Sequence, residues 1–211
     1  MTLLITGLVL FLGIHSIGIV ANARRDQLAK SLGPLGWRAL YSIVAIVGFV
    51  LIIKGYAAAR LDPTVLWYPP RWTSHVTAVL MLPVVVLLLA AYLPGRIKDA
   101  LKHPMLVATK SWALAHLLAN GTLADVLLFG GFLVWAVADR ISLKRRVART
   151  TVSLPKTGAN DVIAVIGGLA LYGGFVAYLH KALIGVAPFG KKNGSGRTPT
   201  PVTQHMKRLT T

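Results

Sequence analysis

Two histidines stand inside long apolar stretches of this sequence, where an ionisable side chain is costly and therefore points to a function. His15 lies in the stretch FLGIHSIG, and His116 lies in SWALAHLLAN. A neutral imidazole is the usual protein ligand of b-type haem, and imidazoles from two different helices can hold the iron from both faces. The alternative for each residue is a structural histidine that hydrogen-bonds a neighbouring helix.

The expected depths of the two histidines in a membrane differ. At about 1.5 Å per residue, His15 lies roughly 10 Å from a boundary at Asn22, and His116 lies roughly 20 Å from a boundary at His103. His103 is the rival ligand from the same segment, because thirteen residues at about 100° each place it on nearly the opposite helix face from His116. His103 also precedes Pro104, so an interfacial role in the first helical turn is its alternative.

Two charged residues fall within or beside the same segments. Lys110 comes seven positions after His103 and hence lies on the same helix face, where it could pair with a haem propionate or an anionic substrate. Its alternative is to extend toward the lipid headgroups. Asp125 belongs to the sequence Thr122-Leu123-Ala124-Asp125, which predicts a capping box at the start of a helix.

The remaining histidines and the absence of several motifs limit the ligand pairs and reaction classes that the sequence supports. His75 and His180 fall near the opposite interface and could form a second ligand pair, although histidines with access to water need no such role. His205 lies in a polar tail. The absence of Cys excludes disulfides, thiolate-bound metal centres and covalent c-type haem. The sequence also lacks a Gly-rich phosphate loop, an HExxH pair and a GxSxG elbow, so phosphoryl transfer, zinc proteolysis and serine hydrolysis find no support.

Apolar segments of about twenty residues, the length that crosses a bilayer, must position these side chains. The chain is 55% hydrophobic and only 14% charged, which argues against a soluble protein. We expect helices at 3–21, 39–59, 76–93, 105–119, 123–141 and 162–186. The sequence thus predicts an all-α, polytopic integral membrane helix bundle of about six transmembrane helices. A transmembrane domain would occupy residues 1–189, and residues 190–211 would form a basic, disordered tail rich in Gly, Ser, Thr and Pro.

The distribution of positive charge predicts orientation and partners. The chain holds 23 Lys and Arg against six acids, and the basic residues cluster in the first, third and fifth connections. Retained positive charge marks the cytoplasmic side, so both termini should lie outside, although the basic tail opposes this assignment. Because these residues sit in loops beside apolar segments, we expect them to meet the lipid bilayer and not nucleic acid. No Lys or Arg precedes the first segment, which we therefore interpret as a retained helix and not a signal peptide.

Several segments together carry a family resemblance: FLGIHSIG, LDPTVLWYPPRWTSH, the long run AAYLPGRIKDALKHPMLVATKSWALAHLLANGTLADVLLFGGFLVWAVADR, NDVIAVIGG and LHKALIGVAPF. They resemble the NnrU family of bacterial inner-membrane proteins, and the resemblance extends from Leu3 to about Phe189. It implies a multi-pass protein of the bacterial inner (cytoplasmic) membrane that is linked to nitrate, nitrite and nitric oxide metabolism in denitrification.

A more distant resemblance implies a cofactor. The zeta-carotene isomerase of plants and cyanobacteria binds b-type haem through two histidines, and it carries a His-Ser-Gly motif and an HPxxV segment followed by Ala-His. Carried over, these motifs place the haem ligands at His15 and His116, with His103 as a further shared histidine. Here His15 is followed by Ser16-Ile17-Gly18 and not directly by Ser-Gly, which weakens the first assignment.

Two hypotheses of different classes follow. In the first, the chain is a haem-b membrane protein with His15 and His116 as metal ligands and with His103 and Lys110 near the cofactor. It would work with respiratory or nitric-oxide-metabolism proteins. In the second, it is a cofactor-free scaffold or assembly factor for a respiratory complex. A haem-dependent carotenoid isomerase is a less favoured alternative, and the sequence leaves open whether the chain is an enzyme.

Overall fold

A computed structural model describes residues 1–145, 154–185 and 188 of the chain, and all regular elements in these residues are helical. The elements are α1 (Thr2–Val20), α2 (Asn22–Ser31), α3 (Gly33–Ala59), α4 (Thr73–Tyr92), α5 (Arg96–Leu101), α6 (Pro104–Ala119), α7 (Leu123–Asp125), η1 (Val126–Gly130), α8 (Gly131–Leu143), α9 (Gly158–Gly174), η2 (Phe175–Leu179) and α10 (His180–Ile184). The segments η1 and η2 are π-helical turns within longer helices. The predicted all-α fold is confirmed. The tail 190–211, predicted to be disordered, lies outside the described residues.

Within the described ranges, five helices are long and apolar enough to cross a membrane: Thr2–Val20, Gly33–Ala59, Thr73–Tyr92, Leu123–Leu143 and Gly158–Ala182. Their outer faces carry many exposed Leu, Ile and Val side chains, as lipid-facing surfaces do. The fold is that of a multi-pass membrane protein. The predicted count of six spans is not confirmed, because α6 has 16 residues and is therefore about 24 Å long, shorter than the roughly 30 Å hydrocarbon core.

The connections hold more helix than the sequence predicted. The first contains the polar helix α2, and the third contains the short helix α5. Helix α3 begins at Gly33 and not near Ala39, because Pro34 occupies its first turn, where a missing N–H costs nothing. Pro104 has the same place in α6, with His103 at the N-cap, as predicted.

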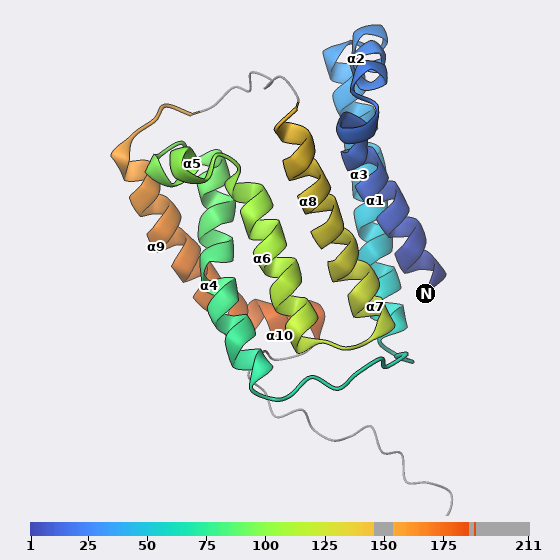
Figure 1. Cartoon of the computed structure of the whole chain (residues 1–211), viewed down its shortest axis with the longest axis vertical. Helices are drawn as coiled ribbons and strands as arrows, with labels where there is room; N and C mark the ends of the chain where they lie inside the picture. Colours follow the sequence, from blue (N-terminus) through green and yellow to red (C-terminus); the bar gives the residue numbers. More distant parts are fainter. Residues whose placement is uncertain (146–153, 186–187, 189–211) are drawn as a thin grey trace, which may run out of the picture.

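The helices form two groups joined by α8 (Figure 1). Helix α1 packs mainly on α3, whereas α4 packs on α6 and α9; α8 contacts both α1 and α6. The main core cluster draws its buried side chains from α1, α3, α6 and the α7–η1 segment. Figure 1 places α2, α5 and the first residues of α6 and α9 at one end of the bundle, which we call the basic end, and the N-terminus, α7 and α10 at the opposite end.

Glycines set the close approach of α1 and α3. A Cβ atom on Gly7, Gly48 or Gly55 would come within 2.2–2.7 Å of a backbone nitrogen of the opposite helix. Small residues permit such contact between membrane helices, which van der Waals packing then stabilises. This packing fixes the rotation of α1 about its axis and so directs Phe11 and His15 toward α3 and α8.

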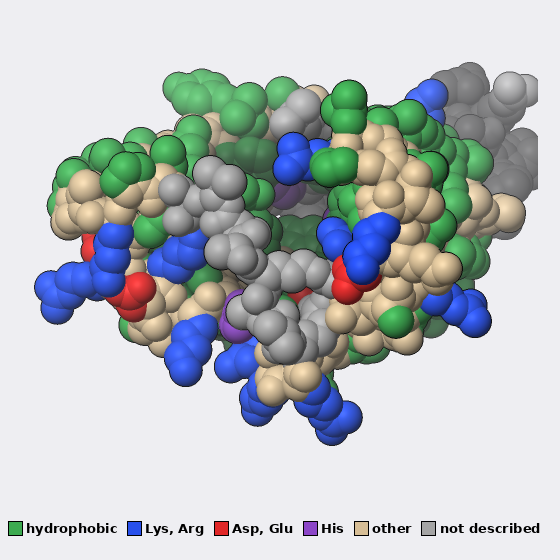
Figure 2. All heavy atoms as spheres, turned by 90° about the horizontal axis from the view of Figure 1, so that it is seen from above, with side chains coloured by type: hydrophobic (Ala, Val, Ile, Leu, Met, Phe, Trp, Pro, Cys, Tyr) green, Lys and Arg blue, Asp and Glu red, His purple; other side chains and the backbone are tan. Residues whose placement is uncertain are grey.

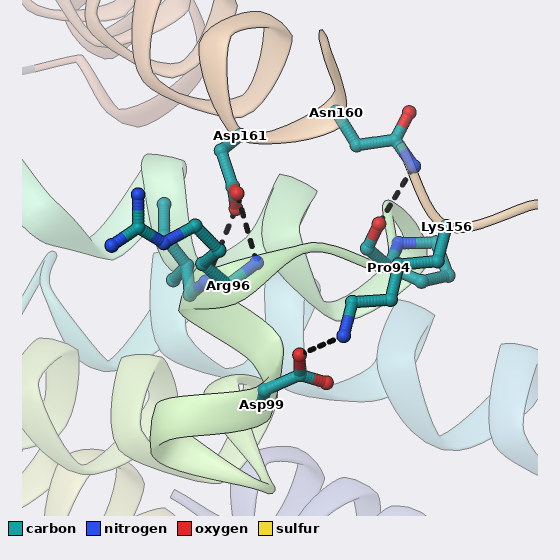
Figure 3. A network of polar contacts seen from close by, with 7 residues as sticks. Pro94, Arg96, Asp99, Lys156, Asn160 and Asp161 are labelled. Atoms are coloured by element: carbon teal, nitrogen blue, oxygen red, sulfur yellow. Dashed lines mark hydrogen bonds and ion pairs between the residues drawn. The ribbon is translucent and has the colours of Figure 1, made fainter. Parts of the chain in front are cut away.

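Asp161, at the start of α9, caps the N-terminus of α5 (Figure 3). Its carboxylate accepts hydrogen bonds from the backbone N–H groups of Arg96, at 2.8 Å, and Ile97, at 3.1 Å. These are two of the four N–H groups that a helix start leaves without partners, and a negative charge there also interacts favourably with the helix dipole. Gly95 is required for this approach, because a Cβ atom on it would lie 2.4 Å from Asp161 Oδ1.

Further contacts tie the start of α9 and the segment before it to the same connection (Figure 3). The side-chain amide of Asn160 donates to the carbonyl oxygens of Pro94, at 2.7 Å, and Pro155, at 2.9 Å. Lys156 forms an ion pair with Asp99 of α5. Asn160 and Asp161, at the start of α9, therefore hold α9 against the connection that follows α4 at the basic end.

The opposite end is held by the predicted capping box. Thr122 and Asp125 cap one another at the start of α7, as expected. Asp125 is only 4% exposed, and its carboxylate accepts further hydrogen bonds from the Thr122 hydroxyl, at 2.6 Å, and from the Tyr56 hydroxyl of α3, at 2.6 Å. The loop before α4 is fixed here too, because Leu66 N–H donates to the Gly121 carbonyl at 2.8 Å. Asp125 therefore has a structural role that links α3 to α7.

Candidate functional site

His15 is held in a defined orientation on α1. Its Nδ1 lies 2.6 Å from the Phe11 carbonyl oxygen, one helical turn earlier, and its ring stacks on the Phe11 ring with centroids 4.2 Å apart. Tyr41 of α3 and Trp135 of α8 complete the surroundings, at centroid distances of 5.3 and 5.8 Å. Because a carbonyl oxygen can only accept, Nδ1 must carry the proton, which leaves the Nε2 lone pair available to a metal ion.

A cavity of about 700 Å³ opens beside His15 at the basic end, between α1, α2, α3 and α8. This volume is within the range of small-molecule and cofactor sites, roughly 300–1,000 Å³. The lining combines aromatic, charged and aliphatic side chains, among them His15, Arg25, Trp37, Arg38, Tyr41, Trp135 and Asp139. Figure 2 looks onto this end of the molecule and shows Lys and Arg side chains around its rim.

The charged residues of the lining lie nearer the surface of the bundle than the neighbouring rings on the same helices. On α8, Asp139 lies four residues, or about 6 Å, closer to the basic end than Trp135. On α3, Arg38 lies nearly one turn closer to that end than Tyr41. The charged residues therefore surround the mouth of the cavity, and the rings of His15, Tyr41 and Trp135 form its floor.

One donor in the floor has no partner. Within the described part of the chain, Trp135 Nε1 is a buried side-chain nitrogen without a hydrogen-bond acceptor. A buried N–H that makes no hydrogen bond costs about 1–3 kcal/mol. The unmet donor belongs to a ring that lines the cavity and meets the His15 ring edge-on, at an interplanar angle of 89°.

His116 has a similar local geometry but lies away from the cavity. Its Nδ1 is 2.9 Å from the Trp112 carbonyl oxygen, and its ring stacks on Phe129 of η1 at a centroid distance of 4.7 Å. The carbonyl again leaves Nε2 as the nitrogen available to a metal. His116 is not among the residues that line the cavity at His15.

The two histidines are at different levels of the bundle. His116 stacks on Phe129, and His15 packs beside Trp135, which follows Phe129 by six residues on the same helix and hence lies about 9 Å closer to the basic end. Three rings connect the two levels through successive contacts, with centroids 5.4 to 5.6 Å apart: Trp112, Phe132 and Phe11. The imidazoles therefore do not face a common gap, and their joint ligation of one iron stays a prediction that requires these rings to move.

Comparison with known proteins gives one family match. The family model described as "NnrU protein" matches residues 3–188. The chain belongs to the NnrU family. The resemblance predicted from the sequence motifs is thereby confirmed, and the matched range contains every residue of the cavity and, apart from Thr2, all the candidate spans. No curated protein and no solved structure matches this NnrU chain.

The other predicted site residues of the NnrU chain lie outside the cavity. His103 is at the N-cap of α6, where partial burial lowers its pKa and the Arg140 guanidinium of α8 lowers it further. Lys110 is half-buried on α6. His75 is exposed on α4, and His180 begins α10 with its ring edge-on to Phe175. Among the described residues, no group of three or more His, Asp or similar side chains could hold a metal ion. His205 is outside those residues.

Sequence reasoning identified His15 but missed the rest of its cavity. Trp37, Arg38 and Tyr41 fall in a segment that was predicted to be partly a loop, and Trp135 and Asp139 are far away in the sequence. No motif joins them. Only the rotation of α3 and α8 against α1 brings them together.

Proposed function

We propose that this NnrU protein is a multi-pass membrane protein that binds b-type haem, with His15 as an axial ligand. The observation that carries the proposal is the cavity of about 700 Å³ at His15, whose Nδ1 is occupied by the Phe11 carbonyl while its Nε2 can bind iron. A histidine without such a role would be an expensive residue in an apolar helix.

The residues present fit this cofactor. Trp37, Tyr41 and Trp135 supply flat apolar walls for a macrocycle, and Arg25 and Arg38 supply positive charge at the mouth for its two propionates. Haem bound here would supply one-electron transfer or the binding of a diatomic ligand such as nitric oxide. This chemistry supports the proposed link to nitrate, nitrite and nitric oxide metabolism.

The spectrum of the purified protein tests the proposal. After expression with sufficient haem and extraction in mild detergent, we expect a Soret band that His15→Ala weakens or shifts. His75→Ala is the matched control, because it removes an exposed histidine from α4 and should leave the spectrum unchanged. A wild-type protein without a Soret band would refute haem binding and favour the cofactor-free scaffold.

His116→Ala separates two forms of the proposal. In the structure, His116 is about two helical turns below the level of His15, so we expect this variant to keep its haem. Loss of the His15-dependent spectrum in His116→Ala would instead support the pairing of both histidines, with Trp112, Phe132 and Phe11 displaced on haem binding.

We further propose that α6 is a sixth, short span in a bacterial inner membrane, and that the basic end faces the cytoplasm. Helix α6 is packed between α4 and α8, which would shield its ends from lipid. Because the chain has no Cys, single cysteines can report the sides. Ser31→Cys on α2 should react with an impermeant maleimide only after the cells are opened, whereas Tyr68→Cys, 86% exposed in the wild type, should react in intact spheroplasts. The reverse pattern would refute this orientation.

A further inference from the structure

The mouth of the His15 cavity has guanidinium groups on two helices. Arg25 of α2 is held in place, because its Nη1 donates to Asp26 Oδ1 at 2.9 Å and its guanidinium carbon lies 5.4 Å from the centre of the Trp37 ring. Arg38 follows Trp37 on α3 and is exposed at the same opening. Trp37 is buried and the Arg25 guanidinium lies over its ring, so this contact joins α2 to α3.

These two arginines differ from the other basic residues of this end. Positive charge here also sets membrane orientation, and exposed residues such as Arg24 and Lys30 on α2 need no further role. Arg25 and Arg38, in contrast, line the cavity. Asp139 lines it as well and Asp26 pairs with Arg25, so two carboxylates balance the two guanidiniums at the mouth.

We infer that Arg25 and Arg38 form a carboxylate-binding subsite, which selects ligands with an acidic edge and an apolar body. The acidic edge lies at the mouth between the two guanidiniums, and the apolar body extends toward Ile14, Tyr41 and Trp135 on the floor. Arginine suits this role because its planar guanidinium can donate two parallel hydrogen bonds to one carboxylate. The inference rests on the proposed haem function, for which the acidic edge is the pair of propionates.

Haemin and its dimethyl ester separate the subsite from the axial ligand. Both contain the same iron and macrocycle, but the ester has no carboxylates. Each compound is titrated into cofactor-depleted full-length protein in a neutral detergent without anionic lipid, and the Soret band is recorded. The wild type should bind haemin about tenfold more tightly than the ester, since two partly exposed ion pairs each contribute about threefold.

Substitutions test whether the preference for haemin over its dimethyl ester depends on the two arginines. Arg38→Gln and Arg25→Gln should each lower the haemin-to-ester preference about threefold, without a change in the band position that reports His15. Arg24→Gln is the matched control on α2 and should keep the full preference. Added KCl gives a measurement on the unaltered protein, because screening should reduce the preference of the wild type.

The outcomes are distinct. Equal binding of haemin and its ester by the wild type would overturn the subsite but leave haem binding intact. Binding of neither compound would overturn the proposed function and the subsite with it. An Arg24→Gln effect as large as that of Arg38→Gln would show that general surface charge, and not the cavity, sets the preference, which also overturns the inference.

Discussion

Replacement of Gly7 by Ala should separate α1 from α3 and destabilise the protein. A Cβ atom on Gly7 would lie 2.6 Å from the Ile52 nitrogen and 2.9 Å from the Gly48 carbonyl oxygen. Ordinary van der Waals contact begins near 3.4 Å, so the two helices would have to move apart by about 0.8 Å. A gap of that size forfeits roughly a quarter to a half of the attraction between the atoms that it separates.

Gly13→Ala on the same helix is the matched control, because no atom lies within 4 Å of its new Cβ position. Both variants gain the same helix propensity, about 1 kcal/mol in water. The difference between them therefore isolates the steric term. Overpacking typically costs about 1–3 kcal/mol, and we expect the upper end, about 3 kcal/mol, because the obstacle at Gly7 is backbone and cannot rotate away.

Unfolding in mixed micelles of mild detergent and dodecyl sulfate, followed by circular dichroism, measures this difference. Gly7→Ala should unfold at a lower dodecyl sulfate fraction than the wild type, and Gly13→Ala should unfold at the same fraction or a higher one. The reasoning would be refuted by equal stability of the two variants, because that result would mean that α1 and α3 are not in backbone contact at Gly7.

Three further variants test particular contacts. Tyr56→Phe removes the hydroxyl that donates to the buried Asp125 carboxylate and should lower the free energy of unfolding by about 2 kcal/mol in the same micelle assay. Trp135→Phe keeps an aromatic ring in the cavity wall but removes the unmet N–H, so the ligand-free protein should become up to about 1 kcal/mol more stable; a clear loss of stability would show that the packing of the larger ring outweighs the cost of the unmet N–H. The pKa of His103 is lowered in the folded protein, so folding favours the neutral imidazole. The resulting contribution of His103 to the free energy of unfolding is present above the unfolded pKa, about 6.5, and is lost as the pH falls through the folded pKa. Thermal melts between pH 8 and pH 5 should therefore fall less steeply in His103→Gln than in the wild type.

Features encoded by neighbouring residues could be predicted from the sequence. The Thr122–Asp125 capping box and the placement of Pro104 in the first turn of α6 depend on residues within one helical turn, and both are confirmed. The different depths expected for His15 and His116 also agree with the levels at which the structure places them, because helical rise alone fixes such a difference.

Features that depend on contact between helices far apart in the sequence could not be predicted from it. Helix α2 has no apolar face from which the sequence could predict it, and packing against α1 and α3 positions it. The cavity needs Arg25, Trp37 and Trp135 from three helices, and their meeting depends on how the glycines of α1 and α3 set the rotation of those helices. The orphaned indole nitrogen is likewise invisible in a sequence, since only burial makes it costly.

The capping of α5 by Asp161 has a consequence for the order in which the chain matures. The N–H groups of Arg96 and Ile97 receive their acceptor from a residue that leaves the ribosome about 65 residues later. During synthesis the first turn of α5 therefore remains solvated while the earlier helices are already being inserted. The connection after α4 becomes fixed only when the last span arrives, so a chain that stops before residue 158 should expose that connection to protease even though its earlier helices are in the membrane.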